Sequence, residues 1–147
     1  MEDYRKINKR IRYFFRFKMV KKKVVSRATR RRGGKVSQNY LQYKGSALLL
    51  VKERIEYFNQ FNNYKYGRLV VRNQKTRWGS CSKKGNLNFN YKIVLLTSKQ
   101  ADYIIVHELC HLKEFNHSQR FWGLVAQTVP DYKEVRSSLR KNGLSLG

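Results

Sequence analysis

The stretch TSKQADYIIVHELCHLKEFNH, residues 97–117, decides the fold of this chain. It opens with a capping-box pattern, in which Thr97 and Gln100 satisfy backbone N–H groups at the start of a helix. We therefore predict a helix over residues 101–115. Polar residues spaced three or four apart along such a helix share one face, so they can act together.

Two histidines of this helix, His107 and His111, lie one turn apart, so both imidazoles can reach the same ion. Glu108 is offset by one position, from which its carboxylate can hold a water beside that ion. This is the physical content of the H-E-x-x-H pattern, which supplies two zinc ligands and a general base. The pattern predicts a metal site rather than a chance arrangement on a helix surface.

A catalytic zinc site needs a third protein ligand. Glu114 is two turns from the first histidine, roughly 10 Å along the helix, which one ion cannot span. The chain has one further histidine, His117, which can bind if the chain leaves the helix and folds back. Asn116 tolerates the left-handed conformation that such a reversal often needs. Glu134 is the alternative third ligand, although its position early in a later helix favours a capping role.

The composition indicates one domain with one modest core, because the chain has 147 residues, of which 41% are apolar and 14% aromatic. Two cysteines, Cys81 and Cys110, are too few for a disulfide scaffold, so we expect reduced thiols. The longest uncharged apolar run, residues 47–51, is far too short to span a membrane. No signal peptide is visible. We expect a soluble, cytoplasmic protein with no membrane contact.

The formal net charge is +24, of which residues 1–50 carry +14 and residues 51–147 carry +10. The electric field of this many positive charges attracts polyanions. The alternative is that the charged side chains only keep the surface solvated. We predict a basic arm over residues 1–35 and a folded domain over residues 36–147. The residues of the arm expected to contact nucleic acid without sequence preference are Lys21, Lys22, Lys23, Arg30, Arg31 and Arg32.

The rest of the pattern indicates an α+β fold with a small antiparallel sheet and segregated helices. An amphipathic helix is expected over about residues 40–62, ended by Asn62-Asn63. A strand is expected over 67–73, then a hairpin formed by 75–81 and 86–96, with Gly85 in the left-handed position of its turn. Two further helices are expected, over about 119–128 and from Pro130-Asp131 onward.

Three motifs in this order, RWGSC, HELCH and NHSQRFW, strongly resemble the YgjP-like metallopeptidases, which are zincin-fold relatives of the SprT/Spartan proteases. The resemblance extends from about residue 34 to residue 142. It implies a zincin-like fold and one zinc ion per chain, bound by His107, His111 and His117. It also implies Glu108 as the catalytic base in hydrolysis of peptide bonds by a metal-activated water.

An extended peptide substrate is expected to lie along an edge strand, which residues 76–81 could supply through Arg77, Trp78, Gly79 and Ser80. Core packing is the alternative role for Trp78. Tyr132 and Arg77 are candidates for a second oxyanion donor. Two other functions stay open: a nucleic-acid-associated protein, since SprT/Spartan relatives act on proteins at DNA, and a metal-binding module without catalysis.

Overall fold

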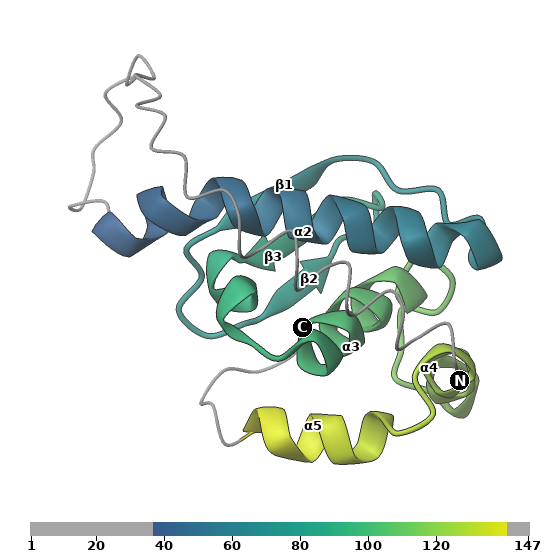
Figure 1. The fold of residues 1–147 in the computed structure, drawn as a ribbon. Helices are drawn as coiled ribbons and strands as arrows, with labels where there is room; N and C mark the ends of the chain where they lie inside the picture. The colour runs from purple at the N-terminus through teal and green to yellow at the C-terminus, as the bar shows by residue number, and fades with distance from the viewer. Residues whose placement is uncertain (1–36, 141–147) are drawn as a thin grey trace. The chain divides into compact units, whose positions relative to one another are not determined.

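The computed structural model describes residues 37–140, which form four α-helices, one 3-10 helix and three strands (Figure 1). In chain order they are α2 (Gln38–Asn62), β1 (Leu69–Arg72), β2 (Gly79–Cys81), β3 (Leu87–Asn90), η1 (Tyr91–Leu95), α3 (Ser98–Cys110), α4 (Gln119–Thr128) and α5 (Tyr132–Arg140). The predicted α+β class is confirmed. The predicted basic arm, with its nucleic-acid candidates between residues 21 and 32, lies outside the described residues.

The three strands form one sheet in the order β1-β3-β2. β2 and β3 pair antiparallel as the predicted hairpin, and Gly85 has the expected positive φ of 72° in its turn. The prediction of a wholly antiparallel sheet is wrong, because β1 pairs with β3 in parallel. β3 is the middle strand, and β1 pairs with the edge of β3 that faces away from β2.

The second hairpin strand is shorter than the predicted 86–96, because β3 ends at Asn90 and η1 follows it. Asn90 is fully buried, and its side-chain amide donates to the carbonyls of Gln74 and Arg77 at 2.8 and 2.9 Å. Its side-chain oxygen accepts from the backbone N–H of Lys92, which caps the 3-10 helix. One polar side chain therefore ends the strand and ties it to the loop before β2.

α3 lies at the centre of the fold, where it contacts α2, β2, α4 and α5. Every residue from Ala101 to His111 is buried. The predicted capping box is present, with the Thr97 side chain accepting from the Gln100 N–H and the Gln100 side chain accepting from the Thr97 N–H. The cap and the tertiary packing together hold the element that carries the histidines.

α2 is joined to α3 by a buried ion pair between Arg54 and Asp102, with N–O distances of 2.6 and 2.8 Å. The apolar face of α2 lies in the core, and the helix ends where Asn63 adopts a left-handed conformation, as its sequence predicts. No helix among residues 37–140 is long and apolar enough to cross a membrane.

Candidate metal centre

The C-terminal turn of α3 positions three of the polar side chains picked out by the sequence. His107 and Glu108 lie in the last turn, and His111 is the C-cap, with its N–H bonded to the His107 carbonyl at 3.3 Å. The helix therefore ends at Cys110 rather than near residue 115. It ends early because the chain must turn back after His111 to bring the third histidine to the other two.

The return of the chain is made by a short hydrogen-bonded loop. The Glu114 N–H bonds to the Cys110 carbonyl at 2.9 Å, and the Ser118 N–H bonds to the Asn116 carbonyl at 2.7 Å. The Ser118 side chain then accepts from the Phe121 N–H at the start of α4. Asn116 does not adopt a positive φ, so the left-handed reversal considered for it is absent.

The loop brings His117 to the two helical histidines. The potential ligand atoms of His107, His111 and His117 all lie within 4.8 Å of one another. The Nε2 atoms of His107 and His117 are 3.1 Å apart. The first two histidines are buried and the third is exposed, so the cluster reaches solvent at His117.

All three rings pack around Phe121, whose centroid lies 4.6–4.9 Å from each of theirs. Phe121 is fully buried, so it anchors the histidine loop in the core.

The surroundings favour neutral imidazoles, which is the form that binds metal. Burial lowers the pKa of His111, and burial together with the His111 and Arg136 charges lowers the pKa of His117. The His111 Nδ1 lies 3.1 Å from the Glu114 carbonyl. Because a carbonyl only accepts hydrogen bonds, this contact places the imidazole proton on Nδ1. The unprotonated Nε2 is then the atom whose lone pair can bind a metal.

Glu108, the residue that follows His107 in α3, is fully buried. Neither of its carboxylate oxygens has a hydrogen-bond partner among residues 37–140. Burial raises the pKa of this carboxyl group to about 8, and the nearby positive charge of Arg77 limits the rise. A buried carboxylate without such partners is costly in a purely structural role. A cation at the three imidazoles would offset that cost, so the residues present fit a metal ion.

Gly79 makes room for this carboxylate. A Cβ atom at residue 79 would lie 2.7 Å from Glu108 Oε1, closer than side chains tolerate. Sequence reasoning placed Gly79 in a substrate strand, but it did not foresee this contact. The signal was a glycine within a short strand, which often marks a close approach of another group.

A stacked column supports the exposed histidine. The ring of Trp122 stacks on His117 at 5.5 Å between centroids and on Tyr132 at 5.3 Å. The Arg136 guanidinium also lies over Trp122, at 4.7 Å from the ring centroid. This column links α5 to the histidine loop, and it assigns Tyr132 a packing contact that the sequence did not predict.

The other candidate residues lie in different surroundings. Trp78 is 4% exposed and belongs to the hydrophobic core. Ser80 pairs with Asn88, and its hydroxyl accepts from the Asn88 amide at 3.5 Å. Because neighbouring residues of a strand point to opposite faces, the Ser80 side chain lies on the other face from Gly79 and Glu108. Arg77 and Glu134 are exposed, and Glu134 is outside the histidine cluster.

Comparison with known families decides the class of this protein. Residues 9–142 match the family described as YgjP-like, metallopeptidase domain. The chain belongs to this family. The match covers nearly the whole chain and includes all three histidines. Membership in the YgjP-like family implies a metal, and the cluster of His107, His111 and His117 could bind it.

Two solved structures share the fold of this YgjP-like chain. The metallopeptidase zymogen of Pyrococcus abyssi, abylysin, is 25% identical, with a TM-score of 0.60 over 66% of this chain and 99% of that one. The metallopeptidase zymogen of Methanocaldococcus jannaschii, jannalysin, is 22% identical, with a TM-score of 0.53 over 63% of this chain and 95% of that one. No curated protein matches the chain. The family match supports a metallopeptidase function.

Proposed function

We propose that this YgjP-like protein is a zinc-dependent peptidase with one zinc ion per chain, bound by His107, His111 and His117. The observation that carries the proposal is the convergence of three imidazoles at the end of the helix that also carries the buried carboxylate of Glu108. When bound, zinc supplies a Lewis acid that polarises a carbonyl and lowers the pKa of water. Three histidines with an open side match the ligand number of catalytic rather than structural zinc sites.

Glu108 acts as the general base in this proposal. Its carboxylate accepts a proton from the attacking water as the new C–O bond forms, and it then donates that proton to the amine nitrogen as the C–N bond breaks. The proton moves through Oε1 or Oε2, the two buried oxygens without partners among the described residues. Burial raises the pKa of this carboxyl group, which makes it a stronger base for taking up the proton of water.

The substrate is proposed to be a peptide or protein segment that lies along β2. β2 is an edge of the sheet among the described strands, so its outer backbone groups are available to an extended peptide. Gly79, at the start of β2, is in close contact with the Glu108 side chain. Pairing along β2 would therefore bring a peptide bond next to the general base. Arg77, which is exposed two residues before Gly79, is proposed to contact the substrate at this end of β2.

The non-catalytic alternative is less favoured, because a metal site that only stabilises the fold has no use for a buried carboxylate held beside it. Nucleic-acid binding by residues 21–32 stays a prediction, and so does a cytoplasmic location.

The test is hydrolysis of an unfolded protein substrate by the zinc-loaded chain, compared with Glu108→Gln. We expect the substitution to lower activity by about 10²–10⁴-fold, the usual contribution of a general base, while zinc content stays unchanged. Equal activity of the two proteins would contradict the proposal.

A further inference from the structure

The sheet region of the chain has an unusual distribution of charge. From residue 57 to residue 101 the sequence contains nine lysines and arginines and no aspartate or glutamate. The acidic residues on either side of this region belong to α2 and to α3. A one-sided distribution of this kind produces a local positive field rather than a mixed, solvated surface.

Part of this charge lies at the beginning of β2. Arg77 is exposed and comes two residues before Gly79. It forms no ion pair with any residue in the described part of the chain. Arg77 therefore provides a cation available to a substrate at one end of the strand beside the general base.

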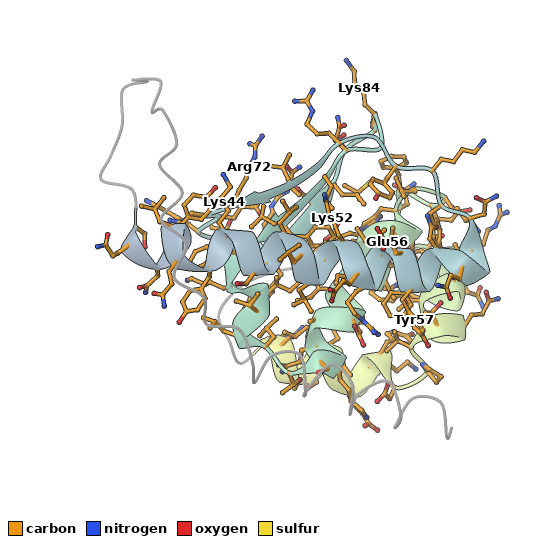
Figure 2. The ribbon with its side chains drawn as sticks, turned by 45° about the horizontal axis from the view of Figure 1, so that its top comes forward. Lys44, Lys52, Glu56, Tyr57, Arg72 and Lys84 are labelled. Atoms are coloured by element: carbon orange, nitrogen blue, oxygen red, sulfur yellow. The ribbon has the colours of Figure 1, made fainter. Side chains whose placement is uncertain are left out.

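More of the charge lies just beyond the other end of β2. Lys83 and Lys84 are exposed in the turn that joins β2 to β3, and neither is ion-paired to a residue between 37 and 140. The turn is closed by a bond from the Gly85 N–H to the Ser82 carbonyl at 2.8 Å. Its tip projects away from α2, as Lys84 shows in Figure 2.

This turn also packs against the end of the histidine helix. A Cβ atom at Gly85 would lie 3.5 Å from Cδ2 of Leu112, the residue that follows His111. The turn that carries the two lysines therefore packs next to His111, one of the proposed metal ligands. Cations thus lie at both ends of β2, and the histidine helix packs against the strand and its turn.

We propose that the site selects peptide segments with acidic residues on both sides of the bond to be cut, an inference that rests on the peptidase function proposed above. In an antiparallel pairing, the C-terminal side of the peptide approaches Arg77 and its N-terminal side approaches Lys83 and Lys84. A peptide strand advances about 3.4 Å per residue, as β2 does. An acidic residue of the peptide therefore meets Arg77 about two residues after the bond to be cut, and another meets the two lysines about four residues before that bond.

A peptide fits this arrangement better than a nucleic acid does. The cations flank an exposed strand edge, whose backbone donors and acceptors pair with an extended peptide. β2 carries Gly79, Ser80 and Cys81 and therefore offers no aromatic platform for stacking bases.

The test uses three peptides with one shared neutral core and two glutamates, two glutamines or two lysines at the flanking positions. kcat/KM is measured with the full-length, zinc-loaded protein. Kd for the same peptides is measured by fluorescence anisotropy with zinc-loaded Glu108→Gln. We expect the glutamate peptide to have about tenfold higher kcat/KM and about tenfold lower Kd than the glutamine peptide, because it forms two exposed charge pairs with the protein. The lysine peptide should be the weakest of the three.

A matched pair of variants separates the proposed surface from net charge. Lys83→Gln/Lys84→Gln and Lys44→Gln/Lys52→Gln each remove two positive charges, but the second pair lies on α2, which contacts β1 at the opposite edge of the sheet (Figure 2). We expect the first variant to reduce the glutamate preference to about threefold and the second to keep it at about tenfold.

Equal values for the three peptides, or equal effects of the two variants, would overturn the inference. The two proposals fail in different ways. Cleavage of all three peptides at one rate would leave the peptidase function standing and remove the selectivity. Preferential binding of the glutamate peptide without cleavage of any peptide would keep the acidic-segment surface and contradict the peptidase function.

Discussion

Gly79 of β2 and Glu108 of α3 lie in such close contact that a methyl group at residue 79 would be 2.7–2.9 Å from three atoms of the glutamate side chain. The strand thus holds the carboxylate from one side. The side chain has no hydrogen-bond partner among the described residues that could hold it instead. The position of the proposed base therefore depends on the absence of a side chain at residue 79.

Gly79→Ala is expected to displace Glu108 while the histidines stay in place. We expect kcat/KM to fall about 100-fold, because a displacement of about 1 Å can cost that much. Zinc content, measured by mass spectrometry, should be unchanged. Gly45→Ala is the control, since a Cβ there meets nothing within 4 Å and alanine favours a helix. Full activity of Gly79→Ala would show that Glu108 adapts freely.

The ion pair of Arg54 and Asp102 should be important for stability, because both residues are buried. Asp102→Leu leaves the guanidinium charge buried, so we expect the free energy of unfolding in urea to fall by about 3–5 kcal/mol. The double variant Arg54→Met/Asp102→Leu removes both charges and should recover most of that loss. A loss in Asp102→Leu below about 1 kcal/mol would mean that water or another group compensates the arginine.

Trp122 should act as a positioning residue for His117 through the stacked column. Trp122→Ala removes the stacking surface, and we expect zinc affinity to fall about 10–100-fold in competition with a chelator. Trp122→Phe keeps an aromatic face and should retain most of the affinity. If both variants bind zinc as the parent does, the histidine loop is held by Phe121 and its hydrogen bonds alone.

The two thiols should be unreactive in the folded protein. Burial and the Glu108 charge raise the pKa of Cys81 to about 11, and burial raises the pKa of Cys110 to about 11. At pH 8 only about one thiol in a thousand is then ionised, so alkylation by iodoacetamide should be slow and should accelerate about tenfold per pH unit.

The same shifts give a pH dependence of stability. Each thiol stays protonated in the folded chain up to about pH 11, whereas in the unfolded chain it ionises near the ordinary thiol pKa of 9.0. The free energy of unfolding should therefore fall as the pH rises from about 9 to about 11. Alkylation at pH 8 as fast in buffer as in urea would contradict the raised pKa values of the two thiols.

Much of the fold could be predicted because its signals are local. The capping box at Thr97, the left-handed turn at Gly85 and the helix end at Asn63 each follow from the chemistry of a few neighbouring residues. The parallel pairing of β1 could not be predicted in this way, because strand order depends on contacts between distant segments. The early end of β3 was missed because Asn90 bonds to carbonyls 13 and 16 residues away.

The features of the candidate site also differ in whether they follow from local sequence or from contacts between separate elements. The histidine cluster follows from spacing on one helix and one short loop, so it could be predicted from sequence. The fit of Gly79 against Glu108 and the stack of Tyr132 on Trp122 join separate elements. Such contacts are properties of the folded chain, and periodicity in the sequence does not encode them.

The central claim is that three histidines of one chain bind one zinc ion. Its most direct test is metal content by mass spectrometry, measured on the purified full-length protein and on His117→Ala. We predict about one zinc per chain in the parent and a large loss in the variant. A parent protein that contains no zinc after mild purification would contradict the claim, and so would a variant that retains its zinc, which would move the third ligand away from His117.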